Sequence, residues 1–278
     1  MHRLGRADLH VHSHWSDGRQ SPEALVLAAA GRVDILAVTD HDEVGGALLA
    51  RRFARARPEL GVDVVVGEEV STLNGHLLAL FIEERIPPGL TAETTVDLIH
   101  RQGGLAVVPH PLHPIRYARR GHRPLAELLE ALPVDAVEVV NNSGPLACFY
   151  DARALVANDR WRRPVCGGSD AHDVRYVGSG LTRFEGRDAG ALRRALAAGR
   201  THAHLNWSWT LGRLPGHVRL KCGDAARFAR LALSLRRVLS IGGLERAPDA
   251  PPGRLGAPRR SRGAPRYPDE RAGREEAC

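Results

Sequence analysis

Short apolar runs of strand length recur over residues 1–206, and segments with helical periodicity separate them. The runs predict strands at Ala7–Ser13, Val33–Thr39, Val62–Gly67, His76–Ile82, Leu105–Val108, Ala136–Val140 and Pro164–Gly167. The intervening segments predict helices at Pro22–Ala30, Gly46–Ala56, Thr91–Gln102, Pro124–Leu132, Leu146–Asn158 and Ala189–Ala198. The first helix has a clear start signal, because Ser21 is a typical N-cap residue and Pro22 suits the first turn.

The order of these elements predicts the fold class. Strands and helices mainly alternate, and the strands are too apolar to leave one face in water. This pattern favours an α/β fold, in which helices cover a parallel sheet or surround a parallel barrel. About seven strands is close to the number that a barrel needs.

The pattern deteriorates after about Trp209. We expect one domain over residues 1–206 and a C-terminal extension over 207–246, in which Ala225–Val238 has the spacing of an amphipathic helix. Residues 247–278 are rich in Pro, Gly and Arg and poor in apolar side chains. Such a segment cannot bury enough surface to offset its ordering entropy, so we expect it to be disordered.

The positive charge is confined to the C-terminal quarter. Residues 1–210 hold 24 Arg and Lys against 25 Asp and Glu, whereas residues 211–278 hold 15 against 7. Lys221 is the only lysine, which is more typical of a coding bias toward arginine than of a selected phosphate-binding surface. Basic tails can bind nucleic acid, but a solvated tail is the favoured interpretation.

Composition and cysteine usage are typical of a globular cytoplasmic protein. Hydrophobic residues make up 43% of the chain, and no apolar run approaches the roughly 18 residues that span a bilayer. The N-terminus has no apolar signal region, since a charged strand-like segment begins almost at once. The cysteines at positions 148, 166, 222 and 278 lack CxxC spacing, so we expect free thiols. No membrane partner is predicted.

Almost every predicted strand ends in, or begins with, a side chain that can bind metal. These side chains are His10 and His12 with the nearby Asp17, then Asp40, His41 and Asp42, then Glu68 and Glu69, then His76, His110 and Glu138, and finally Asp170 and His172. In parallel α/β folds the carboxyl ends of the strands meet at one face, where sites are built. We therefore expect residues that span 160 positions of sequence to converge on one site.

The segment "DLHVHSHWSDG" is the densest part of this pattern. His10 and His12 are two residues apart on a predicted strand, so their side chains share a face, with α-carbons about 6.6 Å apart. Two imidazoles at that spacing can reach one ion at about 2.0–2.1 Å. Asp17 then adds a carboxylate at a turn before Gly18.

Several other polar residues have an ordinary structural interpretation. Isolated histidines, at positions 2, 14, 100, 122, 202, 204 and 217, are typical of surface or hydrogen-bonded residues. Asp40 and Asp42 can simply terminate a strand, and Glu68 can be a solvated neighbour of Glu69. Glu138 lies inside an apolar run, where an unpaired charge would be costly, so it is either a partner of a ligand or a ligand itself.

The motifs "DLHVHSHWSDG", "AVTDHD", "GEEVST", "VVPHP" and "GGSDAH", in this order over about residues 7–185, resemble the polymerase and histidinol phosphatase (PHP) family of metal-dependent phosphoesterases. The resemblance implies a distorted (β/α)7 barrel with two or three divalent ions, of Mn, Zn or Fe, at its C-terminal face. It implies a first ion held by His10, His12, Glu69 and Asp170. A second would share Glu69 and add His110 and His76, and a third would use Asp17, His41 and His172.

These residues and the resemblance together predict a phosphoesterase. A hydroxide held by the metal cluster would attack a phosphate monoester in line, with Glu69, His110, Asp170 and His172 as the catalytic residues. We expect Asp40, Asp42 or Glu138 to orient ligand histidines. Arg116, Arg19 and His113 are candidates for contacting the substrate phosphate.

Alternative functions stay open. The expected substrate is a phosphorylated small molecule such as a nucleotide, and the first alternative is a nuclease or oligonucleotide phosphatase. The second is a module without catalytic activity that binds metal or nucleic acid. Only about thirty residues separate His76 from the "PHP" motif, so the inserted domain of some nucleotide-hydrolysing branches is absent. The sequence does not indicate an oligomeric state.

Overall fold

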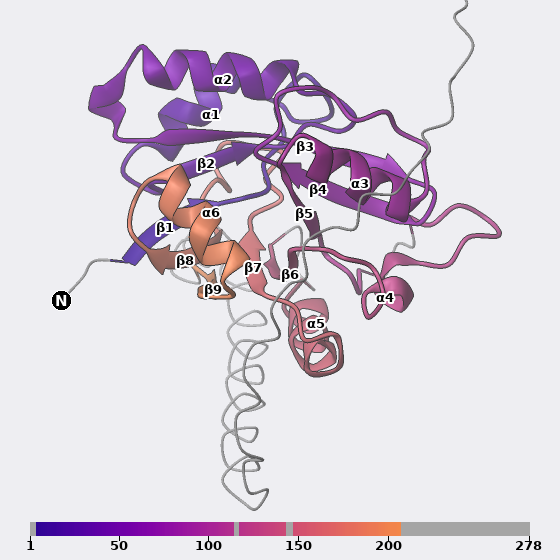
Figure 1. Cartoon of the computed structure of the whole chain (residues 1–278). Coiled ribbons are helices and arrows are strands. Elements are labelled where there is room, and N and C mark those ends of the chain that lie inside the picture. The colour runs from indigo at the N-terminus through magenta and orange to yellow at the C-terminus, as the bar shows by residue number, and fades with distance from the viewer. Residues whose placement is uncertain (1–3, 114–116, 143–146, 207–278) are drawn as a thin grey trace, which may run out of the picture. The chain divides into compact units, whose positions relative to one another are not determined.

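One mixed sheet, built from segments far apart in the sequence, organises the fold (Figure 1). The computed structural model describes residues 4–113, 117–142 and 147–206. Within these residues nine strands form the sheet in the order β7-β6-β5-β4-β3-β2-β1-β8-β9. The strands are β1 (Leu4–Asp8), β2 (Ile35–Val38), β3 (Asp63–Thr72), β4 (Gly75–Leu80), β5 (Leu105–Val108), β6 (Ala136–Asn141), β7 (Val165–Gly168), β8 (Gly180–Glu185) and β9 (Thr201–Leu205).

The helices follow the predicted segments closely. They are α1 (Pro22–Ala29), α2 (Gly45–Arg55), the 3-10 turn η1 (Pro58–Leu60), α3 (Ala92–Arg101), α4 (Leu125–Leu128), α5 (Ala147–Trp161) and α6 (Ala189–Ala197). The expected cap of α1 is confirmed, since the Ser21 hydroxyl accepts a hydrogen bond from the backbone N–H of Ala24 at 3.3 Å. The helix expected at Pro124–Leu132 is much shorter, and it ends at Leu128.

The strands do not all run parallel, which corrects one expectation. β1, β2 and β3 pair in parallel, as do β5, β6 and β7, but β4 is antiparallel to both of its neighbours. The two strands that the apolar pattern missed, β8 and β9, add a further antiparallel pair beside β1. Neither forms a continuous apolar run, because Thr182 and Arg183 interrupt β8 and His202 and His204 interrupt β9.

Side chains of β3 show how the sheet separates two kinds of environment. Val64, Val66 and Val70 pack with residues of α1, α2 and α3 on the outer surface of the sheet. Val65 faces the interior, where it joins apolar residues of the other strands. Because the strand alternates, Glu69 shares the interior face with Val65, while its neighbour Glu68 faces outward. Glu68 is nevertheless 0% exposed, which corrects the expectation of a solvated side chain, because the outer surface of β3 is covered by other parts of the chain. The interior of the barrel therefore carries a polar centre above an apolar core.

The sheet nearly closes through side chains of β8 and β9 that bind the backbone of β7. The Thr182 hydroxyl accepts a hydrogen bond from the Gly167 N–H at 2.9 Å and donates one to the Gly167 carbonyl at 2.8 Å. The Thr201 hydroxyl donates to the Val165 carbonyl at 2.6 Å. A Cβ atom at Gly180 would lie 1.9 Å from the Gly168 carbonyl oxygen, so only glycine permits this approach. The arrangement confirms the predicted distorted α/β barrel.

Helix α6 lies at the end of the barrel opposite the polar centre. Its side chains Leu192, Ala195 and Leu196 belong to the interior apolar cluster. The N–H of Ala189 donates to the Asp63 carboxylate at the start of β3, at 3.2 Å. Figure 1 shows α6 across β1, β8 and β9, away from α3 and α4. Since α6 seals the end where β3 begins, access to the interior is from the end where the parallel strands finish.

Some expectations fall outside the described residues. The extension at 207–246, with its expected helix, and the basic tail at 247–278 belong to that group, as does Arg116. Cys166 is a buried free thiol, in agreement with the expectation for that cysteine. The part of the chain that the structure describes contains no helix that is long and apolar enough to traverse a bilayer.

Candidate metal centre

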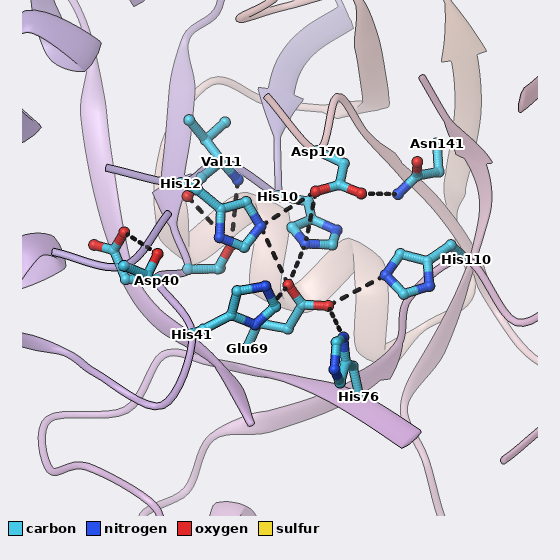
Figure 2. A network of polar contacts seen from close by, with 12 residues as sticks. His10, Val11, His12, Asp40, His41, Glu69, His76, His110, Asn141 and Asp170 are labelled. Carbon is cyan, nitrogen blue, oxygen red and sulfur yellow. Dashed lines mark hydrogen bonds and ion pairs between the residues drawn. The ribbon is translucent and has the colours of Figure 1, made fainter. Parts of the chain in front are cut away.

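The carboxylate of Glu69 is the meeting point of five histidines (Figure 2). Its Oε2 atom lies 2.9 Å from His10 Nε2, 3.2 Å from His12 Nε2 and 3.5 Å from His41 Nδ1. Its Oε1 atom lies 2.9 Å from His76 Nδ1 and 3.2 Å from His110 Nε2. The two oxygens of one carboxylate thus face two different sets of imidazoles, as a carboxylate shared by two ions would.

These side chains reach one mouth of the barrel from five strands. His10 and His12 follow β1, which ends at Asp8, so they lie beyond the strand on which the sequence predicted them. They still share a direction, because Val11 forms a β-bridge with Ala171 and holds the backbone extended. His41 follows β2, and His110 follows β5. Glu69 lies inside β3, which is longer than expected, and His76 lies at the start of the antiparallel β4.

Asp170, His172 and Asp17 complete the cluster around His12. Asp170 Oδ1 lies 3.2 Å from His12 Nε2 and 3.5 Å from His10 Nε2. Asp17 Oδ2 lies 3.2 Å from His172 Nε2 and 3.8 Å from His41 Nε2. Three overlapping groups have ligand atoms within 4.8 Å of one another: His10 with His12, Glu69 and Asp170; His12 with Asp17, His41 and His172; and His41 with Glu69 and His76.

Burial gives the cluster its electrostatic character. The side chains of His10, His12 and Glu69 are at most 1% exposed, whereas Asp17 is 53% and His172 is 41% exposed. Burial by itself lowers the pKa of His12, but the carboxylates of Asp170 and Glu69 raise it to about 9. Burial raises the pKa of Glu69, but its histidine neighbours, His10 first, lower it well below the usual range. The mouth therefore favours bound positive charge at its deepest point.

The residues present fit divalent metal ions. His12 is buried, and among the described residues neither of its ring nitrogens makes a hydrogen bond, although Nε2 lies 3.2 Å from oxygens of both Glu69 and Asp170. A nitrogen that faces two carboxylates without hydrogen bonding to either is placed as a metal ligand would be. Imidazole and carboxylate together suit zinc, manganese and iron.

The backbone is strained at the same place. Asp170 has a φ of 52°, His110 of 28° and Asp42 of 53°, all in the left-handed region that residues other than glycine rarely adopt. Such conformations cost about 1–3 kcal/mol each and persist only where the surroundings over-determine them. For Asp170 and His110, whose side chains face His12 and Glu69, the strain indicates that they are directed toward a site at the expense of local stability.

Of the three residues expected to orient ligand histidines, only Glu138 contacts one. The Nδ1 atom of His10 lies 3.4 Å from Glu138 Oε2, and the backbone N–H of His110 donates to the same oxygen at 3.1 Å. Asp40 instead accepts hydrogen bonds from the N–H and hydroxyl of Ser13, at 2.6 and 2.7 Å. Asp42 accepts one from the N–H of Ser71 at 2.7 Å. Both aspartates therefore stabilise loops, because their carboxylates hydrogen-bond to nearby backbone and hydroxyl groups and not to histidines of the cluster.

The candidates for phosphate contact lie at the rim. The Arg19 side chain is 71% exposed and lies 3.6 Å from Asp173, and the Arg19 N–H donates to the His172 carbonyl. His113 lines two pockets on either side of the His110 loop. Burial, followed by the charge of His110, lowers the pKa of His113. Arg116 lies outside the described residues.

Two residues at the site, Tyr117 and Asn141, were not predicted from the sequence. The Tyr117 ring stacks on His76, with ring centroids 4.2 Å apart, and lies beside His110 and His113. Its position soon after the "PHP" motif was an available signal. Asn141 donates hydrogen bonds to Glu138 and Asp170, and no feature of the pattern indicated it.

A family model described as PHP-associated matches residues 152–201. An uncharacterised protein of Methanocaldococcus jannaschii is 34% identical over 148 residues, which cover 49% of this chain and 81% of that protein. A 3',5'-nucleoside bisphosphate phosphatase of Chromobacterium violaceum is 37% identical over 89 residues, or 30% of each chain. A 5'-3' exoribonuclease of Haemophilus influenzae is 44% identical over 66 residues, or 23% of each chain.

The fold also has a counterpart among solved structures. A two-domain protein from Bacteroides vulgatus that contains a predicted PHP-like metal-dependent phosphoesterase superposes with a TM-score of 0.61. It is 20% identical, and the match covers 74% of this chain and 66% of that one. At this identity the similarity concerns the barrel alone.

Proposed function

Because the chain belongs to the PHP family of metal-dependent phosphoesterases, we propose that it hydrolyses a phosphate monoester at the cluster around Glu69. The substrate is a nucleotide or another small phosphorylated metabolite. The observation that carries this proposal is the sharing of Glu69 by five histidines at one mouth of the barrel. The apolar core needs no such cluster, whereas phosphoryl transfer near two or more cations does.

Two or three divalent ions would be held by the cluster; the ligand sets that the resemblance implies share most members with the three groups described above, except that they pair Glu69 and His76 with His110 instead of His41. His10, His12, Glu69 and Asp170 would hold the first, Glu69 with His110 and His76 the second, and Asp17 with His41 and His172 the third. When bound, such ions polarise phosphoryl oxygens and make water more acidic. Manganese, zinc and iron all suit this donor set.

The protein fixes which nitrogen two of the histidines, His172 and His10, present to the cluster. The Nδ1–H of His172 donates to the Asp170 carbonyl at 2.9 Å, which leaves Nε2 directed at Asp17. Glu138 contacts His10 at Nδ1, so Nε2 of His10 is directed at Glu69. A histidine whose second nitrogen is held in this way keeps its tautomer and its orientation. Glu69, His110, Asp170 and His172 are the residues on which catalysis would depend.

Exposure suggests how a substrate approaches. His10, His12 and Glu69 are buried, whereas Asp17, His41 and His172 are partly open to solvent. A phosphate would therefore approach from this open side. Arg19 and His113 lie on the rim on either side of the cluster, where they would bind phosphate oxygens and orient the leaving group.

Hydrolysis of a phosphate monoester is supported by the similarity to the phosphatase of Chromobacterium violaceum, whose name gives a 3',5'-nucleoside bisphosphate as its substrate. The second candidate is hydrolysis of a phosphodiester at the end of an oligonucleotide. It is favoured by the matching exoribonuclease and by the Tyr117 ring beside His76 and His110, since aromatic rings stack on bases. A module without catalytic activity has no need for an open side at the cluster.

The test is hydrolysis by the full chain loaded with Mn²⁺. p-Nitrophenyl phosphate reports monoester cleavage, bis-p-nitrophenyl phosphate reports diester cleavage, and nucleotides, sugar phosphates and short oligonucleotides extend the comparison. We expect turnover of the monoester that is lost with chelator and in His10→Ala. His100→Ala is the matched control, because His100 pairs with Asp135 at 2.8 Å on the outside of the barrel. Metal binding without turnover of any ester would overturn the proposal in favour of a binding module.

A further inference from the structure

Asn141 contacts two carboxylates, that of Glu138 on its own strand β6 and that of Asp170 just after β7; Figure 2 shows the contact with Asp170. Its Nδ2 atom donates to Glu138 Oε2 at 2.8 Å and to Asp170 Oδ2 at 3.3 Å. Both acceptors are carboxylate oxygens, so the amide nitrogen has to face them. Asn141 and Glu138 are 2% and 1% exposed, so these hydrogen bonds are made away from solvent.

A β-bulge brings Asn141 into this position. In a regular strand Glu138 and Asn141, three residues apart, would point to opposite faces of the sheet. The register of β6 against β7 shifts between Glu138 and Val140, so that Glu138 pairs with Cys166 and Asn141 pairs with Gly168. Gly168 faces the interior, because a Cβ atom there would lie 2.5 Å from Glu138 Oε1. The bulge therefore turns Asn141 toward the cluster.

The amide determines which oxygen of Asp170 is available. Oδ2 of Asp170 receives the Asn141 donor, whereas Oδ1 faces His12 Nε2 at 3.2 Å and His10 Nε2 at 3.5 Å. Asp170 has a left-handed backbone, a conformation that persists only where the surrounding structure holds it. On the other side, Glu138 is held against His10 Nδ1. One amide thus orients a metal-facing carboxylate and the partner of a metal-facing histidine.

Helix α5 fixes Asn141 in turn. The Asp151 carboxylate accepts the backbone N–H of Asn141 at 2.9 Å through Oδ1, while Oδ2 of Asp151 is shielded from solvent and has no hydrogen-bond partner in the described residues. Burial first, and then the charge of Glu138, raise the pKa of Asp151 well above its usual range. Asparagine has nearly the same shape as aspartate and keeps a side-chain oxygen that can accept the Asn141 N–H, so it can replace Asp151.

We propose that Asn141 is a positioning residue of the metal centre, which presents Asp170 to a bound ion through one oxygen and holds Glu138 against His10, and that Asp151 fixes Asn141 from α5. The inference rests on the metal centre proposed above. Nothing in it requires Asn141 to touch substrate or metal.

The experiment measures Zn²⁺ affinity of the full chain by competition with a chromogenic chelator, without substrate. Partners behind metal ligands typically change affinity 10–100-fold, so Asn141→Ala should weaken at least one Zn²⁺ equivalent by about that factor. The Co²⁺ absorption spectrum should change as well, because the ligand geometry changes. Asn158→Ala is the matched control, since Asn158 hydrogen-bonds Arg163 at 2.9 and 3.1 Å on the far part of α5.

Asp151 supplies a rescue pair. Asp151→Ala should weaken Zn²⁺ binding, whereas Asp151→Asn should bind within about twofold of the wild type. Wild-type affinity and spectrum in Asn141→Ala would overturn the inference alone, as would equal losses in Asn141→Ala and Asn158→Ala. If the wild-type chain itself bound no Zn²⁺ or Co²⁺, the proposed metal centre would fail and this inference with it.

Discussion

Oε1 of Glu69 lies 2.9 Å from Nδ1 of His76, although the two residues are on strands of opposite direction. Ser71 pairs with His76 across the β3–β4 hairpin, and Glu69 precedes Ser71 by two residues on the same face. The start of an antiparallel strand is therefore at the same mouth as the ends of the parallel strands. Because β4 runs in the opposite direction, the residue at its start, His76, joins a site whose other members lie at or beyond the ends of the parallel strands.

Neighbouring glutamates of β3 provide a matched test of the metal centre. Glu69→Gln removes the charge that five histidines share, so Zn²⁺ affinity and kcat/KM for p-nitrophenyl phosphate should each fall roughly 100-fold or more, because even residues behind metal ligands cost 10–100-fold. Glu68→Gln should change neither value appreciably, since Glu68 faces outward and accepts the Ile86 N–H at 2.7 Å. Equal effects of the two substitutions, measured by chelator competition and steady-state kinetics, would contradict the assignment.

Metal removal should lower thermal stability. An ion that binds only the folded chain stabilises it by about 2.7 kcal/mol when its free concentration is 100 times its Kd. We therefore expect Tm, followed by circular dichroism, to rise with added Mn²⁺ or Zn²⁺ and to return with chelator. Glu69→Gln should show a clearly smaller rise, and a rise of full size in that variant would place the bound ions elsewhere.

The seam of the barrel, where β8 approaches β7 and the sheet nearly closes, depends on the Thr182 hydroxyl. Thr182→Val keeps the shape of the side chain but removes both hydrogen bonds to Gly167. Leaving a buried backbone donor and acceptor without partners costs about 1–3 kcal/mol, which urea unfolding can measure. Thr182→Ser retains the hydroxyl and should recover most of the loss. If Thr182→Ser were as unstable as Thr182→Val, the methyl group rather than the hydroxyl would hold the seam.

Asp34 should make stability depend on acid. Burial raises the pKa of Asp34, but Arg187 and Arg6 more than reverse this and lower it below its usual range. A lowered pKa in the folded state contributes stability that is present above the unfolded value of about 3.9 and is lost as pH falls through the folded value. Asp34→Asn should therefore cost about 2 kcal/mol at pH 7 and progressively less below pH 4.

The control for Asp34 is the exposed pair of Arg51 and Glu83. Glu83 is 66% exposed, so Glu83→Gln should cost no more than about 1 kcal/mol at pH 7. Urea unfolding between pH 3 and pH 7 gives both comparisons. A cost for Asp34→Asn that did not change with pH would show that packing, not charge, accounts for it.

The sequence by itself determined the fold class and most members of the cluster around Glu69. Apolar runs bounded by helical segments require a sheet covered by helices, because no other arrangement buries both faces of such strands. Polar residues such as His41 and His110 stand directly after these runs, so their convergence followed from the topology. The same logic could not find β8 or β9, because polar residues interrupt both strands and neither forms an apolar run.

Tertiary structure alone decided the direction of β4, the β6 bulge and the partners of the acidic residues. Asp40 and Asp42 stand near a strand end, as the histidines of the cluster do, yet their carboxylates accept hydrogen bonds from Ser13 and Ser71 in the neighbouring backbone and do not face the cluster. Asn141 enters the site only because one inserted residue reverses its face. Local sequence specifies periodicity, whereas register and competition between donors depend on groups that meet only after folding.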